Sequence, residues 1–153
     1  MSLRDRFTAE LKTAMKAGDK TRLSTIRLIQ AALKDKDIEA RGQSKDAPGE
    51  DEILALLQKM VKQRQESFAI YEGNARPELA AQERAEIEVI SSFLPQPLGE
   101  AEVDSAISAA IAETGAASVK DMGKVIAKLR ADHAGRMDFA KVSGRVKEKL
   151  AGA

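Results

Sequence analysis

The stretch VKQRQESFAIYEGNARPELAAQE, residues 61–83, decides the fold class of this chain. Apolar residues recur at helical spacing on either side of its centre, and the centre itself, EGNARP, has the composition of a helix stop followed by a turn. Pro77 comes next, at a position that suits the first turn of a new helix, since its missing N–H costs nothing there. The stretch therefore predicts an antiparallel helical hairpin with a tight turn.

Two charged residues lie inside the apolar stripes of this hairpin. At about 100° per residue, Arg64 falls near the centre of the first stripe and Glu83 near the centre of the second. Arg64 lies ten residues before Asn74, the predicted middle of the turn, and Glu83 lies nine residues after it, so the two should face each other. Because an unpaired buried charge is costly, we predict a structural ion pair between Arg64 and Glu83, with Glu86 as a second acceptor. A ligand-binding site is the alternative.

The rest of the chain extends the helical pattern and shows no convincing strand. Two helices precede the hairpin, one ending at Gly18 and one running to about Gly42. The segment LPQPLG, residues 94–99, is the strongest break, because two prolines so close together cannot lie inside a helix without losing hydrogen bonds. The sequence thus predicts an all-α protein with two domains. These are an N-terminal domain of antiparallel hairpins with about four helices, residues 1–94, and a small three-helix C-terminal domain, residues 98–153.

Composition excludes several classes of site. The chain has 153 residues, of which 43% are hydrophobic and only 3% aromatic, and this suits a core of packed helices. It has no cysteine and one histidine, which excludes a disulfide framework, a thiol nucleophile and a multi-histidine metal site. No apolar run approaches the roughly 20 residues that span a membrane, and the N-terminal MSLRDRFTAE lacks the apolar core of a signal peptide. We expect no membrane or metal among its partners, and a cytoplasmic location.

The sequence predicts no self-sufficient active site. Catalysis needs a nucleophile, an acid–base pair or a metal site. The single histidine, His133, lies near the apolar arc at the end of its predicted helix, where packing or capping is its expected role. The segment AETGAAS, residues 112–118, lacks the lysine and the preceding strand of a phosphate-binding loop. We therefore predict no catalytic residue and no cofactor.

Charge is distributed unevenly along the chain, although its net value is +1. Residues 1–46 carry a net +4, residues 47–100 a net −5 and residues 101–153 a net +2. Basic residues share faces of the second, sixth and seventh predicted helices, and such faces can contact nucleic-acid phosphates. Pairing with acidic residues, or simple solvation, is the alternative. The predicted RNA contacts are Arg27, Lys34, Lys120, Lys124, Lys128, Lys141 and Arg145.

A family resemblance is carried by three stretches: MKAGDKTRLSTIRLI (15–29), KQRQESFAIYEGNARPELAAQERAEIEVISSFLPQPLGEAE (62–102) and SVKDMGK (118–124). Through them nearly the whole chain resembles the GatB/YqeY family, and in particular its free-standing YqeY-like members. The residues that fit the family pattern in the hairpin are Arg64, Glu66, Tyr71, Arg76, Leu79 and Glu83.

The resemblance implies an all-helical fold and a link to tRNA. Related domains form the tail of the B subunit of the glutamyl/aspartyl-tRNA amidotransferase, and some are fused to a glutaminyl-tRNA synthetase. In those proteins the domain helps to hold tRNA while the chemistry happens elsewhere. The family is also associated with carbon–nitrogen ligase activity that uses glutamine as the amide donor. The implied partners are tRNA and an aminoacyl-tRNA synthetase or amidotransferase component.

Three functions remain open on these grounds. The first is an accessory tRNA-binding module of the amidotransferase or aminoacylation system. The second is a protein-interaction adaptor with no direct RNA contact, which the near-neutral net charge and the lack of stacking aromatics favour. The third is an amidotransferase or ligase that acts alone. Convergence of the basic residues on one open face would favour RNA binding, whereas pairing with Glu100, Glu102 or Asp104 would favour the adaptor.

Overall fold

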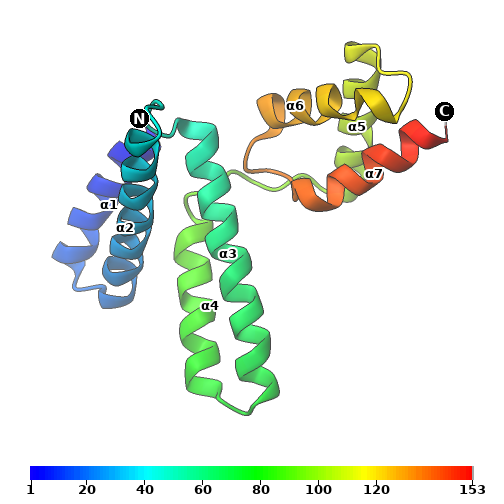
Figure 1. Cartoon of the computed structure of the whole chain (residues 1–153). Helices are drawn as coiled ribbons and strands as arrows, with labels where there is room; N and C mark the ends of the chain where they lie inside the picture. Colours follow the sequence, from blue (N-terminus) through cyan, green and yellow to red (C-terminus); the bar gives the residue numbers. More distant parts are fainter. Residues whose placement is uncertain (153) are drawn as a thin grey trace. The chain divides into compact units, whose positions relative to one another are not determined.

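All regular structure in the computed structural model, which describes residues 1–152, is helical (Figure 1). Seven α-helices and one short 3-10 helix follow one another, and none of the described residues forms a strand. The elements are α1 (Leu3–Ala17), α2 (Lys20–Gly42), α3 (Glu50–Gly73), α4 (Pro77–Ser91), α5 (Glu100–Thr114), η1 (Val119–Asp121), α6 (Met122–His133) and α7 (Phe139–Ala151). The all-α prediction is confirmed.

The chain divides into two compact units. Unit 1 runs from Met1 to Pro95 and contains α1 to α4, and unit 2 begins at Gln96 and contains α5, η1, α6 and α7. The division falls in the proline-containing segment between α4 and α5, where a helix cannot continue. Each unit has its own cluster of buried apolar residues, and the two clusters share no member.

Local sequence sets the ends of the first two helices. The Ser2 hydroxyl accepts a hydrogen bond from the Asp5 backbone N–H at 3.1 Å and caps α1. Gly18 ends α1 at φ 69°, in the left-handed region that glycine adopts at no steric cost. The Asp19 carboxylate then caps α2 by accepting from the Arg22 backbone N–H at 3.0 Å. This short turn makes α1 and α2 antiparallel neighbours.

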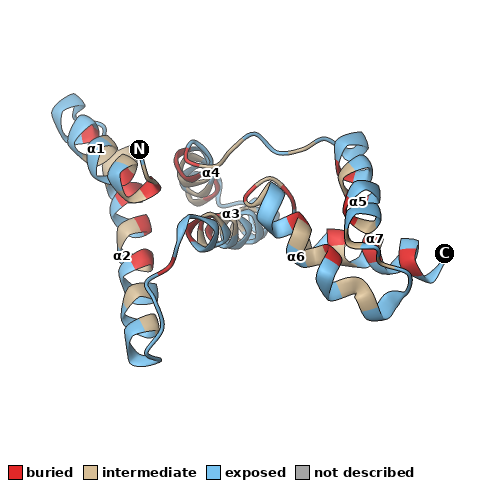
Figure 2. Ribbon diagram, turned by 90° about the horizontal axis from the view of Figure 1, so that it is seen from above, coloured by how far each residue is buried: buried red, intermediate tan, exposed pale blue. Residues whose placement is uncertain are grey.

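The core of unit 1 is formed by all four of its helices and the turn after α4. Phe7 and Phe93 are almost fully buried and meet edge to face, with ring centroids 5.0 Å apart at 77°. Each fully buried large apolar side chain stabilises the fold by about 1.5–3 kcal/mol relative to an exposed one. The core residues, coloured red in Figure 2, are Leu3, Phe7, Ile26, Ile29, Leu33, Ile53, Leu57, Met60, Val89, Ile90 and Phe93.

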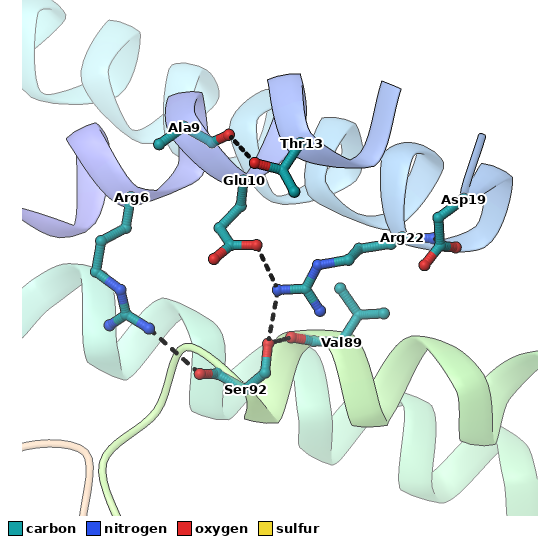
Figure 3. Close-up of polar contacts among 8 residues, drawn as sticks. All are labelled: Arg6, Ala9, Glu10, Thr13, Asp19, Arg22, Val89 and Ser92. Atoms are coloured by element: carbon teal, nitrogen blue, oxygen red, sulfur yellow. Dashed lines mark hydrogen bonds and ion pairs between the residues drawn. The ribbon is translucent and has the colours of Figure 1, made fainter. Parts of the chain in front are cut away.

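Two arginines link α1 and α2 to the end of α4. The guanidinium carbons of Arg6 and Arg22 lie 5.3 and 5.5 Å from the centroid of the Phe93 ring. Arg6 donates to the Ser92 carbonyl oxygen at 3.3 Å, and Arg22 donates to the Glu10 carboxylate at 3.0 Å and to the Ser92 hydroxyl at 3.4 Å (Figure 3). These contacts cover the aromatic core with charged groups that still reach water.

The α3–α4 hairpin continues past this core. The last core residue on α3 is Met60 and the first on α4 is Val89. Between them the two helices extend beyond the ends of α1 and α2 to a tight turn (Figure 1). Ala75 lies in that turn with φ 53°, and Pro77 begins α4, as the sequence predicts. Residues 62–88 thus form a two-helix projection from the four-helix core, called the projection below.

In unit 2, α5, α6 and α7 surround a separate core. The chain before α5 is attached to it by two hydrogen bonds. The Leu98 N–H donates to the Arg136 carbonyl oxygen at 3.0 Å, and the Arg136 Nε donates to the Gln96 carbonyl oxygen at 2.8 Å. The buried core residues are Val103, Ile107, Ala110, Val125, Leu129, Met137, Val142, Val146 and Leu150.

Candidate functional site

The basic face of α7 contacts acidic residues of α5. Arg145 Nη1 lies 3.3 Å from Glu100 Oε2, and Arg145 Nη2 donates to Asp104 Oδ1. Lys149 Nζ lies 4.0 Å from the same Asp104 oxygen and donates to the Ser108 hydroxyl at 3.0 Å. The positive charge of Arg145, a predicted RNA contact, is therefore balanced by carboxylates of its own unit.

On α6, two more of the predicted RNA contacts have acidic partners. Lys128 Nζ lies 3.1 Å from Asp132 Oδ2 and 3.5 Å from Glu113 Oε2. The hydrogen bond with Asp132, followed by the charges of both carboxylates, raises the pKa of Lys128. Lys124 Nζ lies 3.9 Å from Asp121 Oδ1, at the limit of an ion pair. Hydrogen bonds from two backbone N–H groups are the main reason that the pKa of Asp121 is lowered.

Four of the seven predicted RNA contacts are exposed and form no ion pair within residues 1–152. They are Lys120 and Lys141 in unit 2 and Arg27 and Lys34 on α2 of unit 1. The predicted contacts thus belong to both units, and each unit has two that remain unpaired. The three predicted contacts that have acidic partners, Lys124, Lys128 and Arg145, all lie in unit 2.

Arg64 is held inside the projection by an ion pair across the hairpin. Its Nε donates to Glu86 Oε2 at 3.1 Å, and its Nη1 donates to the Met60 carbonyl oxygen at 3.1 Å. The partner predicted first, Glu83, is corrected to Glu86, the acceptor predicted second. The reason is the turn. Arg64 and Glu86 each lie eleven residues from Ala75, whose positive φ marks the centre of the turn one residue after the predicted centre.

Glu83 lies half-buried on α4 without the hydrogen bond that Glu86 has. Burial is the main reason that the pKa of Glu83 is raised above its ordinary value, and the negative charge of Glu86 adds to this effect. The positive charge of Arg64 acts in the opposite direction but does not overcome them. Arg64 therefore interacts with two carboxylates, and its guanidinium is hydrogen-bonded to only one of them, Glu86.

An open groove of about 280 Å³ lies on the projection, between α3 and α4. Its walls include Phe68 and Glu72 from α3 and Ala81, Arg84 and Glu88 from α4. The Arg84 guanidinium lies over the Phe68 ring, 5.3 Å from its centroid. Sequence reasoning missed this groove. Its signal was the 4-3-4 spacing of Pro77, Ala81, Arg84 and Glu88, which puts these residues in one line along a helix.

Comparison with known proteins identifies the family. Residues 4–150 match the family model described as Yqey-like protein. The chain belongs to this family. Three relatives are named Altered inheritance of mitochondria protein 41, mitochondrial. The Lachancea thermotolerans protein is 37% identical over 68% of this chain, the Pyrenophora tritici-repentis protein 29% over 94%, and the Saccharomyces cerevisiae protein 32% over 62%.

The names and lengths of these relatives bear on two expectations for the YqeY-like chain. The predicted cytoplasmic location is wrong by this comparison, because all three relatives are named as mitochondrial proteins.

The aligned part covers 55% of the Lachancea relative, 50% of the Saccharomyces relative and 78% of the Pyrenophora relative. The YqeY-like chain thus spans about half the length of two of them. The relation to the amidotransferase tail domain stays a prediction.

Among residues 1–152, no three His, Cys, Asp or Glu side chains are grouped so that they could hold a metal ion. His133 is half-buried at the end of α6, and its Nδ1 is shielded from water and accepts or donates no hydrogen bond. Over the same residues, no helix is both long and apolar enough to cross a membrane. The distinctive features are the ion-paired basic faces of unit 2 and the groove of unit 1.

Proposed function

We propose that this YqeY-like chain is an accessory module of a glutamine-dependent tRNA amidotransferase or aminoacylation system. It acts as an adaptor that binds a protein component of that system, and the carbon–nitrogen ligase reaction takes place on the partner. The observation that carries the proposal is the position of Arg145 between Glu100 and Asp104. The link to tRNA amidation is supported by the resemblance of residues 62–102 and 118–124 to the GatB/YqeY family.

The ion pairs of unit 2 weaken the case for direct RNA contact. A phosphate that approaches Arg145 also meets Glu100 and Asp104, and one that approaches Lys128 meets two carboxylates as well. Each contact would exchange one ion pair for another and leave an acidic group beside the phosphate. Since phosphate contacts supply most of the affinity of non-specific RNA binding, such a surface gains little from RNA.

Direct tRNA binding is the second candidate, and one observation favours it. Lys120, Lys141, Arg27 and Lys34 are exposed and have no acidic partner within residues 1–152. Those four cations could contact phosphates without breaking an ion pair. No aromatic side chain was predicted to stack on bases, so binding of this kind would depend on the shape of the RNA more than on its sequence.

Titration of the purified chain with unfractionated tRNA over a series of salt concentrations separates these candidates. For the adaptor, we expect affinity no higher than that of an equally charged control protein, and no change in Lys120→Ala/Lys141→Ala. For a tRNA-binding module, log affinity should fall with log salt by about 0.7–0.9 per phosphate contacted, and the double variant should reduce that slope.

The adaptor function also predicts direct binding to a protein partner. We expect the chain to co-sediment with a purified glutamyl/aspartyl-tRNA amidotransferase when tRNA is absent. Ribonuclease treatment of both samples serves as the control for bridging by RNA. Binding to neither tRNA nor the amidotransferase would contradict the proposed function.

A further inference from the structure

The groove on the projection is large enough for a few side chains of a partner but smaller than a typical small-molecule pocket. Its volume of about 280 Å³ is below the roughly 300–1,000 Å³ of pockets that enclose small-molecule ligands. Three of its six lining residues on α4 are alanines, Ala80, Ala81 and Ala85, so over part of the groove only methyl groups cover the α4 backbone. The ring of Phe68 forms the wall on α3. Apolar side chains from a third helix could therefore insert between α3 and α4.

Carboxylates lie at both ends of the groove. In the hairpin register set by Arg64 and Glu86, Glu72 on α3 lies level with residue 78 of α4. Glu88 lies ten residues further along α4, which corresponds to about 15 Å along the helix axis. Phe68 and Ala81 lie between these two carboxylates. The groove thus has a middle formed by Phe68 and alanines, with the Arg84 guanidinium over the ring, and an acidic group at each end.

These two carboxylates are available to a partner. Glu72 and Glu88 are exposed, and neither forms an ion pair within residues 1–152. Among the residues that line the groove, the one cation, Arg84, has its guanidinium over the Phe68 ring. The surrounding sequence adds to the negative field, because residues 47–100 carry a net charge of −5. A cationic partner is favoured by this field both in encounter and in the bound state.

We propose that this groove binds a basic amphipathic helix of a protein partner, an inference that rests on the proposed adaptor function. A middle of Phe68 and alanines between two carboxylates about 15 Å apart matches a helix with Lys or Arg at positions i and i+11, since eleven residues rise about 16 Å. Apolar residues at i+4 and i+7 of the same helix would then face Phe68 and Ala81. The partner helix would complete a three-helix bundle with α3 and α4.

The charges also disfavour two other occupants. A second copy of this chain, packed groove to groove around a two-fold axis, would bring Glu72 and Glu88 toward the same pair in its partner. A nucleic-acid backbone would meet the same two carboxylates with its phosphates. Like charges in contact destabilise a complex, so both occupants are worse matches than a basic helix.

Fluorescence anisotropy with the full chain tests this proposal. The probe is a labelled helical peptide with lysine at i and i+11 and leucine at i+4 and i+7, and the control peptide has glutamate in place of both lysines. Ala81→Trp fills the groove with an indole at an exposed position. Gln82→Trp puts the same indole on the neighbouring exposed residue, which does not line the groove, and is the matched control. Glu72→Lys/Glu88→Lys reverses the charge of the two ends.

Three results are expected. The basic peptide binds and the acidic peptide does not. Ala81→Trp weakens binding of the basic peptide at least about tenfold, while Gln82→Trp leaves it unchanged. The charge-reversed variant prefers the acidic peptide. Absence of binding, equal binding of both peptides, or indifference to Ala81→Trp would overturn the proposal. Self-association that Ala81→Trp abolishes would assign the groove to a second copy and also overturn it.

The tRNA titration shows whether a negative result contradicts the groove assignment or the adaptor function. If the wild-type chain binds tRNA and its groove still selects the basic peptide, the adaptor function without RNA contact fails and the groove assignment stands. If tRNA is not bound, the amidotransferase co-sediments, and Ala81→Trp has no effect on either peptide, the groove assignment fails and the adaptor stands.

Discussion

Arg64 on α3 donates from Nε to Oε2 of Glu86 on α4 at 3.1 Å, and their side chains are only 17% and 12% exposed. The pair lies beyond the four-helix core, in the part of the hairpin that contributes no buried residue to that core. A guanidinium and a carboxylate in contact have a narrow range of favourable geometries, so the pair aligns α3 with α4. The groove of the projection depends on that alignment.

Replacing one partner of this pair should destabilise the protein more than replacing both. Arg64→Met leaves Glu86 poorly solvated and unpaired, and we expect a loss of about 1–3 kcal/mol in the free energy of unfolding. Arg64→Met/Glu86→Leu removes both charges and should recover part of that loss. Urea unfolding of the single and double variants measures the coupling energy. Lys62→Met, an exposed position on the same helix, is the control, and strictly additive losses would contradict an ion pair that matters for stability.

Stability should depend on pH through Glu83. Its pKa is raised in the folded protein, mainly by burial, above the ordinary value of 4.5. A carboxyl group with a raised folded pKa contributes stability that is fully present below the unfolded pKa and is lost as pH rises through the folded pKa. Glu83→Gln removes this loss, so the variant should gain stability relative to wild type as pH rises above the ordinary value of 4.5. Urea midpoints below and above that value, with the exposed Glu78→Gln as control, measure the effect. A parallel pH dependence of wild type and Glu83→Gln would refute it.

The sequence predicted the helices and most of their ends, because capping residues, glycine and proline act locally. Ser2, Gly18, Asp19 and Pro77 all lie where their backbone preferences suggest. The register of the hairpin was harder to predict from the sequence, because it depends on which residue takes the positive φ in the turn. The predicted centre of the turn was Asn74, but Ala75 has the positive φ, and the shift of one residue moves the partner of Arg64 toward Glu86.

The candidate site was harder to predict than the fold. Basic faces on α6 and α7 were visible from spacing within each helix, but three of the carboxylates that approach them, Glu100, Asp104 and Glu113, come from α5. Arg145 is 45 residues from Glu100 in the sequence, and only the packing of α7 on α5 brings them together. The groove escaped detection for a similar reason, since alanines such as Ala81 carry no chemical signal until Phe68 lies opposite them.

The aromatic contact in unit 1 should be its most sensitive point. Phe93→Ala removes a ring that is 1% exposed and contacts Phe7 at 5.0 Å, so we expect a loss of about 3–5 kcal/mol. Phe93→Leu keeps most of the volume and should cost less. Thermal unfolding followed by circular dichroism measures both. Phe68→Ala, on the half-buried wall of the groove, is the control, and an equal loss at both positions would mean that the four-helix core is not the main source of stability.

Arg145 should matter little for stability despite its two partners. Its side chain is 29% exposed, and the side chains of Glu100 and Asp104 are 93% and 53% exposed, so water and salt screen both pairs. We expect Arg145→Gln to change the free energy of unfolding by less than about 1 kcal/mol. Lys147→Gln, exposed on the same helix, is the control for loss of one positive charge. A loss well above that of the control, insensitive to salt, would show that the pair is structural.

The two units should fold separately when the chain is divided between Pro95 and Gln96. Each unit has its own core, and both hydrogen bonds of Arg136 to the segment before α5 lie within unit 2. We expect fragments 1–95 and 96–153 to be helical, with circular dichroism spectra that sum to that of the whole chain. The shorter fragment will be the less stable, because a chain of about 60 residues buries a smaller share of its surface on folding than a longer chain does. Fragment 100–153 lacks the contacts of Gln96 and Leu98 and should lose a further 1–3 kcal/mol or so, at about 0.5–1.5 kcal/mol per hydrogen bond. Equal urea midpoints for 96–153 and 100–153 would show that the segment before α5 does not belong to the C-terminal unit.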